Sequence, residues 1–162
     1  LLKIFDLVTY LGNNAVVAGI GGLIVIALWF SKTRRSYAIG LAATLAGAAI
    51  TGYVMKILVA RSRPEGFIPS VIETSFSFPS GHSVASMALY GFIAFLLCNL
   101  YPEKKRLVAI AAAAIILAVG FSRLYFGVHF PTDVIAGYCI GGLWLLLGIE
   151  ITKRLQTRYP QQ

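Results

Sequence analysis

Five apolar runs, each about as long as a helix that crosses a bilayer, constrain the fold of this chain more than any other feature. They cover residues 15–30, 37–60, 83–100, 107–121 and 134–151. The hydrocarbon core of a membrane requires about 20 predominantly apolar residues per helix. Of the 162 residues, 58% are hydrophobic and 12% are charged, whereas about a quarter of a soluble domain is charged. We therefore predict an all-α, polytopic membrane helix bundle that forms a single domain over residues 1–162.

The N-terminal segment LLKIFDLVTYLGNN is too short and too polar to span a membrane. Its apolar residues recur at helical spacing, which predicts a helix lying in the membrane interface. The chain starts without an initiator Met and without a signal-peptide pattern. We therefore expect it to begin partway through a longer protein, with one more transmembrane helix upstream.

Nine of the 14 basic residues, in a chain of net charge +8, lie in three clusters that follow the first, third and fifth predicted spans. Loops that follow alternate spans lie on one side of the membrane, and the positive-inside rule makes this side cytoplasmic. The C-terminus is then cytoplasmic as well. This placement also argues against nucleic acid as the reason for the basic charge. The clusters are Lys32, Arg34 and Arg35; Lys104, Lys105 and Arg106; and Lys153, Arg154 and Arg158.

Five further basic residues fall on the opposite, outward side, where topology gives no reason for them: Lys3, Lys56, Arg61, Arg63 and Arg123. A charge at membrane depth indicates function by default. Lys56 and Arg63 are seven residues apart, nearly two helical turns, so both can point the same way. Pro64 disfavours helix at Arg63 and marks the exit into a loop. The alternative for Lys56 is that it extends its ammonium group to the interface.

The stretch FPSGHS interrupts the apolar sequence just before the third predicted span. A helix that begins here presents unpaired backbone N–H groups next to Ser80 and Gly81, which is an arrangement that binds anions. Ser80 could equally serve as the N-cap residue. His82 would lie in the first helical turn, at the membrane interface.

His129 and Asp133 stand four residues apart at the start of the fifth span. They could meet on one helix face, or across a helix start if Pro131 is the first helical residue. In both cases the carboxylate can accept the Nδ1–H of the imidazole, which leaves Nε2 as a base or nucleophile. A metal site is the weaker interpretation, because two His and one Asp lack any further ligand spacing.

These groups come from four helix ends on one side of the membrane. Fixed cations, a hydroxyl and a helix N-terminus suit a phosphate, whose transfer depends on positioning and charge stabilisation. Two histidines can then supply a nucleophile and a proton donor. The candidate residues are Lys56, Arg63, Ser80, Gly81, His82, Arg123, His129 and Asp133.

Three motifs in this order resemble the type 2 phosphatidic acid phosphatase superfamily: KILVARSRP, PSGH and SRLYFGVHFPTD. The chain is similar above all to small bacterial membrane members that act on phosphatidylglycerol phosphate and undecaprenyl diphosphate. Such members commonly have six spans, so the first would be missing here. The resemblance implies an integral plasma (inner) membrane enzyme whose site faces the periplasm or the cell exterior.

The resemblance also implies roles. His129 would attack phosphorus and form a phosphohistidine, Asp133 would orient it, and His82 would protonate the leaving oxygen and then activate water. Neither a metal nor a cofactor would be required. The role of Ser122, which fits the third motif, stays open. The phosphate would be held by Lys56, Arg63, Ser80, Gly81 and Arg123.

Several alternatives remain at this stage. The same phosphohistidine could transfer the phosphoryl group to an acceptor other than water, and lipid A phosphate and phosphatidic acid are further possible substrates. A non-enzymatic binder of anionic lipids would need the cations but neither histidine. The oligomeric state is open. Gly137 and Gly141 form a G-x-x-x-G pattern, for which packing within the chain is favoured over dimerisation.

Overall fold

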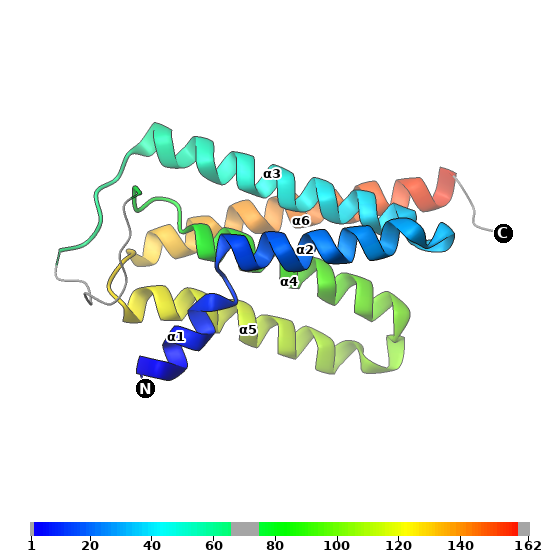
Figure 1. Ribbon diagram of the computed structural model, residues 1–162, viewed down its shortest axis with the longest axis horizontal. Coiled ribbons are helices and arrows are strands. Elements are labelled where there is room, and N and C mark those ends of the chain that lie inside the picture. Colours follow the sequence, from blue (N-terminus) through cyan, green and yellow to red (C-terminus); the bar gives the residue numbers. More distant parts are fainter. Residues whose placement is uncertain (1, 66–74, 159–162) are drawn as a thin grey trace.

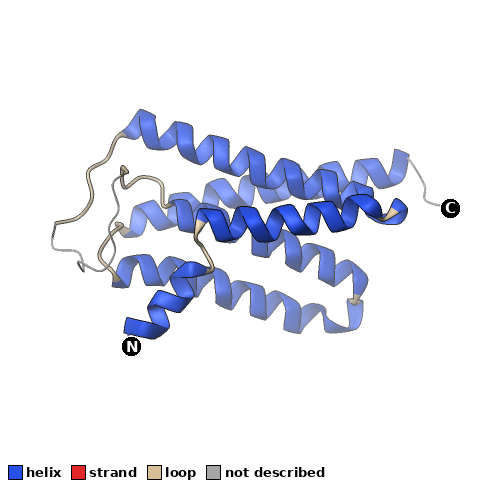
Figure 2. Cartoon of the chain, in the orientation of Figure 1, coloured by secondary structure: helices blue, strands red, loops and turns tan. Residues whose placement is uncertain are grey.

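The computed structural model describes residues 2–65 and 75–158. Within these ranges every regular element is helical (Figure 2), which confirms the predicted all-α class. The elements are α1 (Leu2–Tyr10), α2 (Asn14–Phe30), η1 (Lys32–Arg34), α3 (Arg35–Val59), α4 (Gly81–Leu100), η2 (Pro102–Lys104), α5 (Lys105–Tyr125) and α6 (Pro131–Arg158), where η1 and η2 are short 3-10 turns.

Four helical stretches among the described residues are long and apolar enough to cross a membrane. α2 has 17 residues and meets this criterion only together with α1, from which it is bent by 45°. A fifth span is reached only when this bent pair counts as one, whereas the first span was predicted over residues 15–30 alone; the chain is an integral membrane protein. The four stretches are Lys32–Val59, Gly81–Leu100, Pro102–Tyr125 and Pro131–Arg158.

Small residues allow the helices of this bundle to approach one another closely. A Cβ atom on Gly137 would lie 2.7 Å from Ser83 Cβ, and one on Gly141 would lie 2.7 Å from the carbonyl oxygen of Val84. Both contacts are made to α4 of the same chain. The G-x-x-x-G pattern therefore packs α6 against α4, as predicted, and this face of α6 is occupied within the protein.

The two ends of the bundle are formed by different elements (Figure 1). One end carries η1, η2 and the end of α6, and with them the three basic clusters. At the other end lie the end of α3, the starts of α4 and α6, the end of α5 and the junction between α1 and α2. The candidate residues named from the sequence gather at this second end.

α1 packs against the end of α5 that borders the site. Phe5 stacks on Tyr125 with 4.3 Å between the ring centroids, and Ile4 and Leu7 remain exposed. Exposed apolar side chains on a short helix are typical of a helix that lies in the membrane interface.

Candidate active site

Lys56 and Arg63 reach the same place, although only Lys56 lies on a helix. α3 ends at Val59, and Ala60 adopts the left-handed conformation with φ of 46°. Arg63 therefore lies beyond the helix, in the loop that Pro64 marks, and the spacing of two helical turns does not apply to it. Both side chains instead bind the segment that leads into α4. Lys56 Nζ donates to the carbonyl oxygen of Phe76 at 2.5 Å, and Arg63 Nε donates to that of Ser75 at 2.8 Å.

The start of α4 holds the PSGH motif. Ser80 is the N-cap residue, fully buried, and its Oγ accepts hydrogen bonds from the backbone N–H and the hydroxyl of Ser83 at 3.4 and 3.1 Å. Gly81 and His82 are the first helical residues. Because Oγ accepts both of these bonds, the hydrogen of the Ser80 hydroxyl is still able to donate to an anion.

The start of α6 resolves the two geometries that the sequence allowed for His129 and Asp133. Pro131 is the first helical residue, so the two side chains meet across the helix start. His129 Nδ1 and Asp133 Oδ2 are 3.6 Å apart, which is longer than a hydrogen bond. The direct bond predicted between them is therefore not made in this structure.

The carboxylate of Asp133, which is fully buried, is held by three other donors. Oδ2 accepts from the Ser77 hydroxyl at 2.5 Å and from the backbone N–H of Phe130 at 2.9 Å, and Oδ1 accepts from Arg61 Nη1 at 2.9 Å. A buried charge is tolerated only when it is paired and hydrogen-bonded. These bonds keep Asp133 ionised and fix its orientation.

Ser77 and Arg61 are thus parts of the site that sequence reasoning missed. Arg61 attracted notice only as a basic residue without a topological reason, and its guanidinium also lies 3.8 Å from the centroid of the Phe130 ring. Ser77 belonged to no motif that we recognised. An ionised carboxylate has about four acceptor positions, so a single imidazole could never satisfy Asp133. That shortfall is the signal that further donors stand nearby.

Arg123 lies in the last turn of α5 and is 1% exposed. Its Nη1 donates to Thr9 Oγ1 at 2.8 Å, so α1 helps to orient this cation. The neighbouring Ser122 donates to the carbonyl oxygen of Val119 at 2.6 Å. In this structure Ser122 therefore bonds to its own helix.

His129 is neutral over most of the pH range. Burial, and then the guanidinium groups of Arg63 and Arg123, lower the pKa of His129 from 6.5 to about 3, although Asp133 acts in the opposite direction. Arg63 Nη1 lies 3.4 Å from Nε2. An arginine can only donate, so Nε2 is the acceptor and carries the lone pair. The imidazole is thus prepared to act as a nucleophile.

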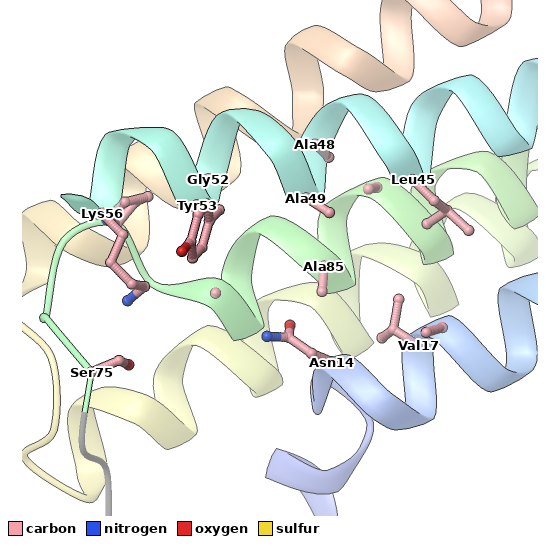
Figure 3. Close-up of a pocket in the computed structure, with 14 residues that line it drawn as sticks. Asn14, Val17, Leu45, Ala48, Ala49, Gly52, Tyr53, Lys56, Ser75 and Ala85 are labelled. Atoms are coloured by element: carbon pink, nitrogen blue, oxygen red, sulfur yellow. The ribbon is translucent and has the colours of Figure 1, made fainter. Parts of the chain in front are cut away.

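A cavity of about 590 Å³ lies between α2, α3 and α4 and reaches this site. Lys56 and Ser75 lie at one end of it, and Val17 and Leu45 lie toward the other (Figure 3). Its wall is formed mostly by small apolar side chains, such as that of Ala49. A polar end joined to an apolar body suits a ligand that has a charged headgroup and a hydrocarbon chain.

The structure brings the candidate residues together around His129. Its protonation responds to Arg63, Arg123, Asp133 and Lys56. His82 in turn lies within electrostatic range of both Arg123 and His129. Within residues 2–65 and 75–158, no group of three or more His, Cys, Asp or Glu side chains is arranged to hold a metal ion.

The fold and the site together define a polytopic helical membrane protein that gathers two histidines, a carboxylate and several cations at one end of its bundle. The sequence profile of the PAP2 superfamily matches residues 37–156, and the chain belongs to this superfamily. The resemblance to type 2 phosphatidic acid phosphatases is thereby confirmed.

Individual relatives agree with this assignment. Phosphatidylglycerophosphatase B of Bacillus subtilis (strain 168) is 45% identical over 97 residues, which cover 58% of this chain and 47% of that protein. Undecaprenyl-diphosphatase of Sulfolobus acidocaldarius is 33% identical over 129 residues, which cover 76% of this chain and 59% of that protein. The chain thus spans about half to three fifths of the length of these two relatives.

A solved structure has the same fold. The crystal structure of a transmembrane PAP2 type phosphatidylglycerolphosphate phosphatase from Bacillus subtilis superposes with a TM-score of 0.86 at 30% identity. The match covers 94% of this chain and 76% of that chain. The arrangement of helices that carries the site is therefore shared.

Proposed function

We propose that this chain is a lipid phosphatase domain that hydrolyses phosphate or diphosphate monoesters of membrane lipids through a phosphohistidine intermediate. One observation carries the proposal: His129 is neutral and its Nε2 faces Arg63, which lines a pocket together with Lys56, and Lys56 also lies at the end of the apolar cavity. The names of relatives that act on phosphatidylglycerol phosphate and undecaprenyl diphosphate support the same substrate class.

The lipid is expected to bind with its hydrocarbon chain in the cavity between α2, α3 and α4. Its phosphate lies at the end marked by Lys56, where Arg63, Arg123, the Ser80 hydroxyl and the backbone N–H of Gly81 can donate to the phosphate oxygens. These donors stabilise the charge that develops when phosphorus becomes five-coordinate. The possible lipids share a phosphate and long hydrocarbon chains, so the test compares them side by side.

In the first step, Nε2 of His129 attacks phosphorus. The bond from phosphorus to Nε2 forms as the bond from phosphorus to the lipid oxygen breaks, and His82, as the imidazolium in the complex with the anionic phosphate, gives its proton to that oxygen and becomes neutral. The ring of His129 becomes cationic, and the buried carboxylate of Asp133 stabilises this charge. In the second step, water attacks phosphorus, His82 accepts a proton from that water, and inorganic phosphate leaves as the bond to Nε2 breaks.

The site is expected to face the periplasm or the cell exterior, with the C-terminus in the cytoplasm of the inner membrane. The basis for this orientation is that the three basic clusters all lie at the end of the bundle opposite the site (Figure 1).

The test is release of phosphate by the purified protein in detergent with EDTA, from phosphatidylglycerol phosphate, undecaprenyl diphosphate, phosphatidic acid and lipid A phosphate. We expect turnover that survives EDTA, inhibition by vanadate as a mimic of five-coordinate phosphorus, and no turnover in His129→Ala. Full activity of His129→Ala would refute the mechanism, and loss in EDTA reversed by magnesium would refute its independence of metal. Appearance of the phosphoryl group on an alcohol instead of water would identify a transferase.

A further inference from the structure

Ser77 lies between the two residues whose pairing the sequence predicted. Its Oγ is 3.4 Å from His129 Nδ1 and 2.5 Å from Asp133 Oδ2, whereas Nδ1 and Oδ2 are 3.6 Å apart. Ser77 and Asp133 are fully buried, and His129 is 5% exposed. The hydroxyl is therefore the group that connects the imidazole to the carboxylate.

The direction of each bond follows from the chemistry of the partners. Arg63 can only donate to Nε2, so the hydrogen of the neutral His129 ring is on Nδ1, which faces Ser77. An ionised carboxylate can only accept. Ser77 therefore donates its own hydrogen to Asp133, and its oxygen accepts the Nδ1–H. Each hydrogen bond in the series that runs from Arg63 through His129 and Ser77 to Asp133 thus has one donor and one acceptor.

We propose that Ser77 is a positioning residue that holds His129 in the Nδ1–H tautomer and couples it to Asp133. This inference rests on the proposed function, in which Nε2 is the nucleophile. When Nε2 bonds to phosphorus, Nδ1 keeps its hydrogen and the ring becomes cationic. Ser77 then transmits the negative potential of Asp133 to that cation through two hydrogen bonds, and it neither gains nor loses a proton.

The hydroxyl can be removed without removing the backbone contact that anchors this segment. The backbone N–H of Ser77 donates to the carbonyl oxygen of Arg61 at 2.8 Å, and Ser77→Ala keeps this bond. Ser86 provides a matched control, because it is also fully buried and its hydroxyl donates only within its own helix, to the Ser83 carbonyl oxygen at 3.2 Å. Ser86→Ala makes the same chemical change away from His129.

The tautomer can be measured directly by NMR of isotope-labelled histidine ring nitrogens, without substrate, because the chain has 2 histidines and His129→Gln assigns their signals. We expect His129 to be the Nδ1–H tautomer at neutral pH in the wild type and in Ser86→Ala. In Ser77→Ala we expect a mixture of both tautomers. A misplaced reacting group can cost about 100-fold in rate, so kcat for lipid phosphate should fall by about 10- to 100-fold, with little change in KM.

Ser77→Thr keeps a hydroxyl and should restore the tautomer and most of the rate. An unchanged tautomer in Ser77→Ala would overturn the proposal, as would a Ser77→Thr variant that matches Ser77→Ala in both measurements. If Ser77→Ala does not fold, Ser77→Cys replaces it as a variant of similar size with a weak donor. A shifted tautomer in Ser77→Ala combined with a wild type that releases no phosphate would support the role of Ser77 and contradict the proposed function.

Discussion

Arg61 offers the sharpest test of how the site is held together, since it supports Asp133 although it lies within KILVARSRP at a position to which the motif gave no role. Its Nη1 donates to Asp133 Oδ1 at 2.9 Å and to Thr132 Oγ1 at 2.8 Å, and its guanidinium covers the Phe130 ring at 3.8 Å. Arg61→Ala removes all three contacts. The carboxylate of Asp133, which is 0% exposed, then keeps only Ser77 and a backbone N–H as close donors.

The expected loss follows from these contacts. A hydrogen bond to a charged group contributes about 1.5–3 kcal/mol, and a cation over an aromatic ring near the surface contributes about 0.5–1 kcal/mol. The Arg61 side chain is 35% exposed, so solvent screens part of the attraction and the lower half of each range applies. We expect Arg61→Ala to lower the free energy of unfolding by about 2–3 kcal/mol.

The assay is an unfolding titration in mixed detergent micelles, followed by circular dichroism. Arg154→Ala is the matched control, because it removes an ion pair of 2.6 Å to Glu150 in which the two side chains are 79% and 53% exposed; we expect almost no change. The double variant Arg61→Ala with Asp133→Asn should lose less than the sum of the single variants. Equal, small losses in Arg61→Ala and Arg154→Ala would refute the reasoning.

Three further predictions concern packing, protonation and the cavity. Gly141→Ala places a Cβ 2.7 Å from a backbone carbonyl oxygen and should destabilise the folded protein by about 1–3 kcal/mol. In Gly142→Ala the new Cβ meets only the flexible end of Met87 at 3.4 Å, so this variant should be neutral or slightly stabilising in the same unfolding titration. The pKa of His129 is about 3 in the folded protein, against an ordinary value of 6.5, so between these pH values the unfolded chain binds more protons than the folded one. The free energy of unfolding should therefore fall as the pH drops from 6.5 to 3. In His129→Gln it should fall less steeply. Ala49→Phe should raise KM for a long-chain lipid phosphate but not for a short soluble phosphate ester, and equal effects on both would contradict the assignment of the cavity.

The sequence predicted the helices well because the membrane imposes a simple rule on them. Apolar runs of sufficient length must be helical in a bilayer, and local signals placed the helix starts, with Ser80 as N-cap and Pro131 as first residue. The first span was the exception. α2 is short on its own and is bent from α1, and no local residue pattern states whether two adjoining helices form one span.

The candidate site was predictable as a set of residues but not as a network. Position at the end of a helix predicts that His82, Arg123 and His129 face one region. It does not predict that the gap of 3.6 Å between His129 and Asp133 is bridged by a hydroxyl. Whether two groups form a hydrogen bond depends on shifts of less than 1 Å. The spacing of residues along a chain does not determine positions that closely.

Gly137 is important both for helix packing and for the geometry of the candidate site. A Cβ on this residue would lie 2.8 Å from the carbonyl oxygen of Ser80, so the absence of a side chain lets the start of α6 approach the start of α4. At that approach the backbone N–H of Ser80 donates to the carbonyl oxygen of Asp133 at 3.0 Å, which joins the PSGH motif directly to the pair formed by His129 and Asp133. The pattern of small residues therefore sets both the packing of α6 on α4 and the distance between the proposed phosphate-binding residues and the proposed nucleophile.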